Sequence, residues 1–456
     1  MKILQVVHNF LPYSYGGTQI HTYHLSKELS KQHEVFIFHR LRDEKRKDYQ
    51  LQEKRFDDLT CFSINNTCRN YNCFEDTYVN KSIEERFVFV LEEVKPHIVH
   101  IHHLHFLSAS IIAAIKKRNI PIVFTLHDYW LLCPQGQFLY NSMSLCGGAD
   151  SKRCVGCMIS RLSYKKGVLA LYYKLSRLLP RLMVQWLKAG YLIYAKKTFL
   201  SKNDAVNKIL ERKWVVNKVF SDVDMFIVPS RFLLNKFVAS GIARDKISFI
   251  ANGIEAGRFA DFKRKQSDKL RFGFIGAIHP AKGVHILIEA FNRITDSDVE
   301  LKIYGKAEPY IGVESYAKKV RKSCKNNNIR FIGEFNNSCV GDVLSEIDLL
   351  VFPSIWHENA PLVLLEALLT QTPVIAARAG GVPELIEDNK NGLLFESGSV
   401  DDLYAKMKNA IDNRRLLEEL SQHKNQVKSI EENARDIEKV YSELVNKVSL
   451  HVTNKR

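Results

Sequence analysis

The chain is 456 residues long, with 46% hydrophobic and 25% charged residues and a formal net charge of +16. This length predicts two or three domains, and this composition is that of a globular protein and excludes a fibrous or low-complexity one. No uncharged apolar stretch reaches the roughly 18 residues of a membrane-spanning helix, so no such helix is expected.

The first half of the chain alternates short runs rich in Val, Ile and Phe with longer helical patterns. Such alternation predicts parallel strands with helices on both faces of the sheet. The opening run is too short for a signal-peptide core, so we interpret it as a first strand and the protein as cytoplasmic. Strands are expected at residues 3–8, 34–39, 98–102, 122–127, 225–229 and 247–251.

The same pattern restarts after a polar, basic stretch, which predicts a second sheet. Its strands are expected at residues 270–275, 301–304, 329–332, 349–352 and 373–377, and the chain after residue 401 is expected to be helical. Two doubly wound Rossmann-like domains facing each other across a cleft are the simplest α/β interpretation. The expected boundaries are a first domain at 1–255, a linker at 256–268, a second domain at 269–430 and a final helix at 431–456 that packs back toward the first domain.

Ligands bind at the carboxyl ends of strands in such sheets, so the strand-to-helix turns are the candidate sites. Gly16 and Gly17 follow the first strand and would let the backbone approach an anion at a helix N-terminus, although a simple tight turn explains them as well. His127 comes just past another strand, where a lone histidine is more often structural. Lys282 precedes a helix, an unfavourable place for a cation unless an anion is bound there.

A fourth turn, which ends at Pro361, is the most informative. Pro361 suits the first position of a helix, which places Asn359 and Ala360 at the cap and Glu358 in the loop before it. Glu366 then lies just over one turn inside an apolar run, where a buried carboxylate needs a partner. Ribose hydroxyls would supply one, and a half-exposed helix glutamate is the alternative.

Several motifs in both halves point to one family. Glu358 and Glu366 have Glu-x7-Glu spacing, and Phe-Ile-Val-Pro-Ser, Ala-Asn-Gly-Ile and Gly-Gly-Val-Pro-Glu stand at 226–230, 251–254 and 380–384. With these motifs the chain resembles the retaining glycosyltransferases of family 4, which have the GT-B fold. The resemblance implies an acceptor-side first domain, a nucleotide-sugar-binding second domain, and sugar transfer from a UDP-, GDP- or ADP-sugar without a catalytic metal or other cofactor.

The resemblance also assigns donor-binding roles. It implies that Glu366 holds the donor ribose, that the turn containing Glu334 meets the base, and that the two N-terminal glycines let the first domain approach the diphosphate. The backbone of residues 359–362 would face the sugar and phosphates. The implied donor-binding residues are Gly16, Gly17, Glu334, Asn359, Ala360, Pro361, Leu362 and Glu366.

The implied catalytic residues are His127, which would contact the transferred sugar, Lys282, which would neutralise the diphosphate, and Glu358, which would face the donor. Family members commonly carry Gly-Arg where this chain has Gly276 and Ala277. One of two expected cations is therefore missing, so either Lys282 works with another basic residue, such as Arg231, or the leaving group is less well stabilised. A retaining outcome without an obvious carboxylate nucleophile implies front-side attack.

Four cysteines lie in an insertion at residues 133–157. Cys133, Cys146, Cys154 and Cys157 have the spacing C-x12-C-x7-C-x2-C and could supply four thiolates to a structural zinc ion. Four reduced thiols without metal explain them equally well.

The positive charge of the chain is concentrated in one region. Residues 151–219 hold 16 Lys and Arg against Asp204 and Glu211 alone. No nucleic-acid-binding motif occurs there, and we expect no nucleic-acid partner. Residues 160–219 mix aromatic, aliphatic and basic side chains, which favours contact with an anionic membrane surface over a merely solvated basic face.

Membrane contact would imply a lipid-linked glycan or glycolipid acceptor. The leading hypothesis is a peripheral enzyme on the inner face of the cytoplasmic membrane that works in surface polysaccharide or glycolipid synthesis. Two alternatives are a nucleotide-sugar epimerase with similar lobes and a non-catalytic subunit that binds sugar nucleotides. The missing cation at Ala277 is compatible with the non-catalytic subunit.

Overall fold

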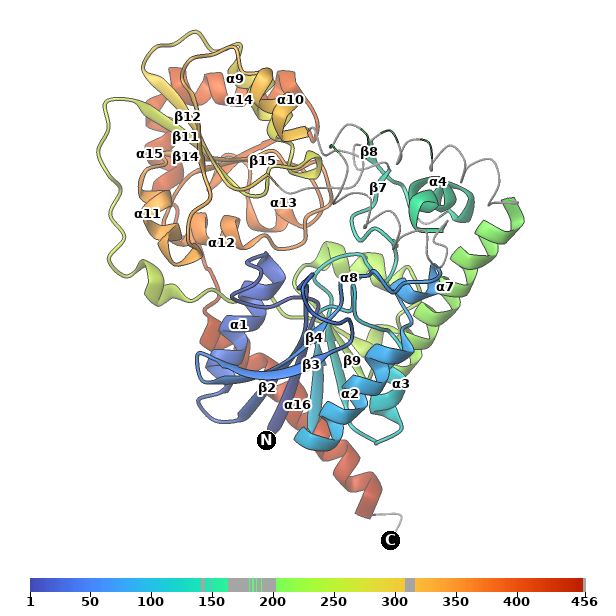
Figure 1. Cartoon of the computed structure of the whole chain (residues 1–456). Helices are drawn as coiled ribbons and strands as arrows, with labels where there is room; N and C mark the ends of the chain where they lie inside the picture. Colours follow the sequence, from blue (N-terminus) through green and yellow to red (C-terminus); the bar gives the residue numbers. More distant parts are fainter. Residues whose placement is uncertain are drawn as a thin grey trace.

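The computed structural model describes residues 1–140, 144–148, 150–162, 202–307 and 316–453, together with Pro180, Met183, Trp186 and Gly190. Most of the predicted membrane-contacting segment at residues 160–219 lies outside the described residues. The described chain forms two lobes, each a parallel or mostly parallel sheet flanked by helices (Figure 1). The predicted pair of doubly wound sheets is therefore confirmed.

The first lobe contains an eight-stranded sheet. Its strands are β1 (Lys2–Val7), β2 (Glu34–Leu41), β3 (Leu51–Phe56), β4 (Leu59–Asn65), β5 (Ile98–Ile101), β6 (Ile122–Thr125), β9 (Met225–Val228) and β10 (Ile247–Phe249). Their order is β10-β9-β6-β5-β1-β2-β4-β3, and only β3 runs antiparallel to its neighbour. Sequence analysis missed β3 and β4, because β3 is a largely exposed edge strand and polar residues interrupt β4.

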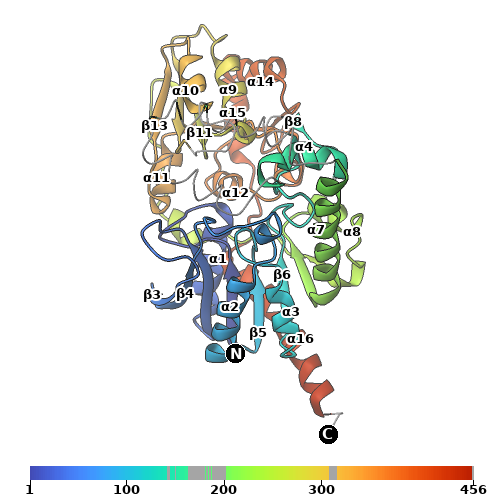
Figure 2. The same cartoon turned by 45° about the vertical axis from the view of Figure 1, so that its right-hand side comes forward.

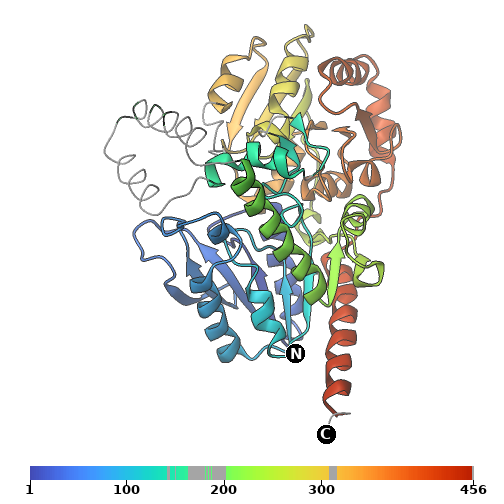
Figure 3. The ribbon, with the colours of Figure 1, turned by 90° about the vertical axis from the view of Figure 1, so that its right-hand side faces the viewer.

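Helices cover both faces of this sheet. They are α1 (Gly17–Leu29), α2 (Lys81–Val94), α3 (Ile111–Lys116), α4 (Ser151–Leu162), α7 (Lys202–Asp222) and α8 (Arg231–Val238), with a small hairpin of β7 (Leu139–Tyr140) and β8 (Ser144–Leu145). In α2, the Asn80 side chain caps the helix, and Ile83, Phe87 and Val90 bury one face at the spacing of helical turns. The long α7 runs along the outside of the lobe (Figure 3).

The second lobe contains a six-stranded sheet that is wholly parallel. Its strands are β11 (Leu270–Ile275), β12 (Val299–Tyr304), β13 (Ile329–Gly333), β14 (Leu349–Phe352), β15 (Val374–Ala377) and β16 (Gly392–Phe395), in the order β13-β12-β11-β14-β15-β16. Five of the six strands were predicted. The four residues of β16 are too few for a periodic signal to stand out from the polar loop before them.

The helices of the second lobe are α9 (Val284–Phe291), α10 (Tyr316–Lys322), α11 (Val340–Ser345), α12 (Leu362–Leu369), α13 (Val382–Leu385), α14 (Val400–Asp412) and α15 (Arg414–Gln422). Short 3-10 turns precede several of them, among them η4 (Pro280–Lys282). Pro361 is the N-cap of α12 and not its first helical residue, because its ψ of 124° is extended. The predicted helix start was therefore one residue early.

The last helix, α16 (Ile430–Thr453), returns from the second lobe and lies against the first (Figures 1 and 2). Ala434, Ile437 and Tyr441 share one apolar core with Ile3 of β1 and Leu25 of α1. The two lobes are thus tied by the C-terminal helix as well as by the linker. None of the helices in the described ranges is long and apolar enough to cross a membrane.

Candidate active site

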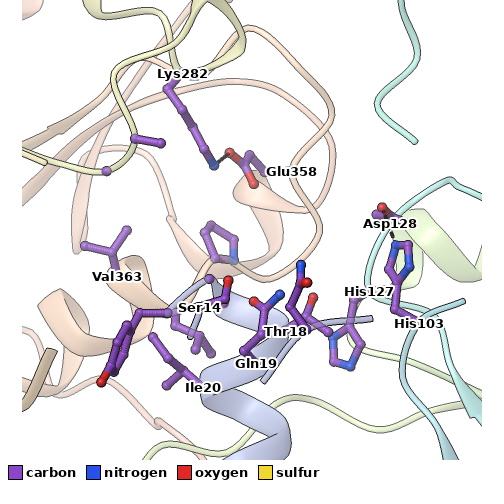
Figure 4. Close-up of a pocket in the computed structure, with 18 of the residues that line it drawn as sticks. Ser14, Thr18, Gln19, Ile20, His103, His127, Asp128, Lys282, Glu358 and Val363 are labelled. Atoms are coloured by element: carbon purple, nitrogen blue, oxygen red, sulfur yellow. Dashed lines mark hydrogen bonds and ion pairs between the residues drawn. The ribbon is translucent and has the colours of Figure 1, made fainter. Parts of the chain in front are cut away.

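A cleft of about 1710 Å³ lies between the lobes, at the carboxyl ends of strands from both sheets. Figure 4 shows residues of both lobes facing each other across it. Every residue predicted for donor binding or catalysis lines this cleft. These residues are Gly16, Gly17, His127, Lys282, Glu334, Glu358, Asn359, Ala360, Pro361, Leu362 and Glu366.

Lys282 and Glu358 form an ion pair on the second-lobe side of the cleft (Figure 4). The Lys282 Nζ atom lies 2.6 Å from Glu358 Oε1, which also accepts a hydrogen bond of 2.8 Å from Ser354 Oγ. The turn holding Lys282 needs Gly283, whose φ is +68° and whose added Cβ would lie 1.8 Å from the Pro353 carbonyl oxygen. Glu358 is buried, whereas Lys282 keeps a quarter of its side chain exposed.

Glu366 is a buried carboxylate on α12 with few partners. Burial raises its pKa to about 7, and the nearby Arg258 guanidinium opposes that rise only in part. Arg258 Nη1 is 3.8 Å from Glu366 Oε1, while the same side chain donates to the Asn337 carbonyl. The carboxylate is therefore poised to accept hydrogen bonds from hydroxyl groups of a ligand in the cleft.

Two helix N-termini face the cleft. Gly16 is the N-cap of the thirteen-residue α1, and neither it nor Pro361 at the start of α12 provides a side-chain cap. Neither helix has an acidic residue in its first turn. Free backbone N–H groups and the helix dipole therefore favour an anion at both ends.

Asn359 joins the two lobes through its side chain. Its Nδ2 atom donates to the backbone oxygen of His127 at 2.8 Å, and its Oδ1 atom accepts from Tyr129 Oη at 2.8 Å. A second link is the Glu384 carboxylate of α13, which accepts from the backbone N–H groups of Arg231 and Phe232 at 2.8 and 2.6 Å. Both ends of the Asn359 carboxamide therefore bond to the first lobe.

The expected second cation is not Arg231. The Arg231 guanidinium lies 4.9 Å from the ring centroid of Phe249 and is not among the cleft-lining residues, so that suggestion was wrong. Lys306 and Arg42 do line the cleft. Lys306 Nζ forms an ion pair of 3.0 Å with Glu334, whose side chain is largely exposed at the rim.

Sequence analysis missed a group of polar residues on the first-lobe side of the cleft. His103 Nε2 lies 2.9 Å from Asp128 Oδ2, and the rings of His8 and His103 are 4.2 Å apart. The signal was present, because His8 and His102 each stand just past the end of a strand. Parallel strands end at one edge of the sheet, so such residues gather there.

His127 is half-buried within this group. Burial and the nearby His21 lower its pKa well below the usual value for histidine. A neutral ring is therefore expected at physiological pH, which can both donate and accept a hydrogen bond.

The four cysteines of the insertion form no disulfide and pack, partly buried, against the core of the first lobe. Burial and the other three thiols raise the pKa of Cys154 to about 12, and Cys157 lines the cleft. Within the described residues, no group of three or more His, Cys, Asp or Glu side chains is arranged to hold a metal ion. The zinc site stays a prediction from the spacing.

Family comparisons cover both lobes. Residues 258–428 match the family model of glycosyl transferases group 1, and residues 15–150 match that of glycosyltransferase family 4. The two matched ranges together make up well over half of the chain. They contain every predicted donor-binding and catalytic residue.

Individual relatives agree with these matches. An uncharacterized glycosyltransferase of Methanocaldococcus jannaschii is 33% identical over 225 residues, which is 48% of this chain and 60% of that protein. The amylovoran biosynthesis glycosyltransferase AmsK of Erwinia amylovora is 26% identical over 43% of this chain and 49% of its own length. The chain thus spans about half the length of these relatives.

Solved structures share the fold. The Anabaena protein HepE, crystallised in complex with UDP and glucose, matches with a TM-score of 0.63 at 15% identity, covering 97% of this chain and 99% of that one. At that identity the likeness shows the fold alone, which is the predicted GT-B arrangement of two Rossmann-like domains.

Proposed function

Because this chain belongs to the group 1 glycosyl transferases, we propose that it is a retaining glycosyltransferase that moves a sugar from a nucleotide-sugar donor to a glycan acceptor. The observation that carries the proposal is the Lys282–Glu358 pair, which lies in the same cleft as the uncapped N-terminus of α1. Although Glu358 balances the charge of Lys282, the cleft presents N–H donors from both lobes where a diphosphate would sit.

The donor is proposed to lie along the second-lobe wall of the cleft. Glu366 accepts the ribose hydroxyls, because among the described residues its buried carboxylate has Arg258, at 3.8 Å, as its one ionic partner. The base then lies near Glu334, and the diphosphate lies between the starts of α1 and α12, within reach of Lys282. His127 meets the transferred sugar from the first-lobe side.

The proposed chemistry is a front-side displacement. The bond from the anomeric carbon to the phosphate oxygen breaks, the acceptor oxygen forms its bond on the same face, and the acceptor proton passes to the leaving phosphate. Negative charge grows on the diphosphate as it leaves. Lys282 and the backbone N–H groups at the two helix starts stabilise that charge, which is the work of preorganised donors.

The acceptor is proposed to be a lipid-linked glycan at an anionic membrane surface. On α7, Trp214 has 68% and Leu210 47% of its surface exposed, and Lys213 and Lys218 are exposed on the same helix. Exposed aromatic and aliphatic side chains beside lysines suit a lipid interface. The polysaccharide role of AmsK supports a place in surface polysaccharide or glycolipid synthesis, with the chain peripheral on the cytoplasmic membrane.

Release of nucleoside diphosphate from a panel of UDP-, GDP- and ADP-sugars tests the proposal. We expect release from one donor that increases when membrane lipid extract is added and persists in chelator. Conversion of the donor to an epimer without an acceptor would instead indicate an epimerase. Tight donor binding without turnover, with lipid present, would indicate a non-catalytic subunit.

Two variants connect the activity to the cleft. Glu366→Gln and Lys282→Met should each lower the release rate. Glu387→Gln removes an exposed carboxylate of the same lobe that forms an ion pair with Lys390 on the surface, and is the matched control. Equal rates in all three variants would refute the assignment of the cleft.

A further inference from the structure

A chain of hydrogen bonds runs from α16 through the first sheet to His127. His127 Nε2 lies 3.1 Å from His102 Nδ1, and His102 Nε2 lies 2.8 Å from the Gln5 carboxamide oxygen. The Gln5 carboxamide nitrogen donates to Tyr441 Oη at 3.4 Å. Tyr441 belongs to α16, so the C-terminal helix reaches the cleft through buried polar contacts.

The directions of these bonds follow from what each atom can do. The carbonyl oxygen of Gln5 can only accept, so His102 Nε2 carries the proton. A neutral His102 then has a lone pair on Nδ1, and His127 must donate to it from Nε2. The second ring nitrogen of His127, Nδ1, is left without a proton.

The hydrogen bonds beyond Tyr441 have directions that agree with this assignment. Tyr441 Oη accepts from Gln5 and keeps its own proton for His100 Nδ1, which lies 2.5 Å away. His100 Nε2 then donates to Thr125 Oγ1 at 2.7 Å. Every buried polar atom in this branch therefore has a partner in one consistent set of directions, as a buried network requires.

Neutral rings are a condition for these assignments, and the surroundings supply it. Burial lowers the pKa of His100 to about 3 and the pKa of His102 well below the usual range. The other titratable groups that act on His102 or His127 are also histidines, namely His8, His21, His100 and His103. The carboxylate of Asp128, the residue after His127, pairs with His103.

We propose that Gln5, His102 and Tyr441 are positioning residues that fix His127 as its Nε2–H tautomer, so that Nδ1 presents a lone pair to a hydroxyl group of the substrate. This proposal rests on the proposed function, because the transferase activity defines which substrate carries that hydroxyl group. The His127 ring lines the cleft, and within the described residues its Nδ1 accepts no hydrogen bond. The reversed Gln5 amide would have the opposite effect and direct an N–H donor at the substrate.

Two variants of Gln5 separate these possibilities by kinetics. Gln5→Glu keeps an acceptor at His102 and should retain wild-type kcat at high pH. Its carboxylate would raise the pKa of His102, and a protonated His102 would donate from Nδ1 and reverse His127. The kcat of the variant should therefore decrease as the pH falls through that raised pKa, an acid limb that the kcat profile of the wild type lacks.

Gln5→Met removes both hydrogen bonds and should lower kcat about tenfold, the equivalent of roughly one hydrogen bond, with the donor KM nearly unchanged. Tyr441→Phe should lower kcat in the same direction. Tyr404→Phe, a tyrosine of α14 in the second lobe, is the matched control and should behave as wild type. Wild-type kinetics in Gln5→Met, or a folded but inactive Gln5→Glu at every pH, would overturn the proposal.

The tautomer can also be read without any turnover. Nitrogen NMR of the full chain labelled at the histidine rings, with His127 assigned by its loss in His127→Gln, should show a neutral ring protonated at Nε2. A ring protonated at Nδ1, or at both nitrogens, would overturn the proposal. Because this measurement needs neither donor nor acceptor, its failure is distinct from failure of the proposed transferase activity.

Discussion

Glu366 provides the sharpest test of how the cleft works, because its raised pKa links stability to function. Its pKa rises from an ordinary value of 4.5 to about 7, chiefly through burial. One unit of pKa difference corresponds to about 1.4 kcal/mol. Ionised Glu366 therefore destabilises the ligand-free protein by about 3 kcal/mol.

The sign of the pH dependence follows from linkage. A carboxyl group whose pKa is higher in the folded state stabilises the fold fully below its unfolded pKa, and that contribution is lost as the pH rises through the folded value. From pH 4.5 to 7 the free energy of unfolding of the wild type should therefore decrease by about 3 kcal/mol relative to that of Glu366→Gln. Denaturant unfolding of both proteins across this range, with Glu387→Gln as the control, measures the difference.

Donor binding should show the opposite trend. A carboxylate accepts hydrogen bonds from two ribose hydroxyls, each worth about 1.5–3 kcal/mol when the acceptor is charged. In the wild type, kcat/KM for the donor should rise with pH to a plateau above about 7, since this ratio reports the pKa of the free enzyme. Glu366→Gln should be lower by about 30-fold and should lack that rise. Parallel stability curves and parallel kcat/KM profiles in the two proteins would refute the reasoning.

Four other changes have defined outcomes. Lys282→Met should lower kcat by about 100-fold or more. It should also destabilise the fold by about 3 kcal/mol, because Glu358 is left buried with Ser354 as its partner. Adding Glu358→Gln should restore the stability in chemical denaturation but not the rate. Tyr129→Phe should lower kcat by less than about tenfold with nucleotide affinity unchanged in calorimetry, since it removes one hydrogen bond between the lobes, and a loss of affinity instead would contradict this. Ala277→Arg should tighten nucleoside diphosphate binding in the same titration by restoring a second cation, and unchanged affinity would argue against a diphosphate beside this turn. Metal analysis of the purified chain should find bound zinc. Cys154→Ser should abolish this zinc, and removing it with a chelator should leave kcat unchanged. A zinc-free chain would leave the four residues as plain thiols.

The sequence predicted the second lobe better than the first. Strands such as β14 and β15 are continuous apolar runs buried on both faces, which sequence patterns detect. The exposed edge strand β3 is instead held by its pairing with β4 and not by an apolar pattern. The residues brought into the cleft were found because they stand in strand-to-helix turns. The signal at Glu366 was an acid in an apolar helix, and its burial explains that signal.

The polar network behind His127 could not be predicted. Gln5 and His102 lie within buried strands or at their ends, where a polar residue has no local signature of its partner. Tyr441 is more than 300 residues from His127 in the sequence, and only the return of α16 onto the first sheet brings it to Gln5. Contacts of this kind depend on the packing of whole elements and not on local spacing.

The central claim is that this cleft transfers a sugar from a nucleotide donor, and a single-turnover experiment with a radiolabelled donor tests it most directly. The wild type and Glu387→Gln should move the label into a lipid-extractable product with release of one nucleoside diphosphate, in the presence of chelator. Folded Lys282→Met and Glu366→Gln should form far less product. Equal transfer by all four proteins, or no transfer from any UDP-, GDP- or ADP-sugar by the wild type with lipid extract present, would contradict the account.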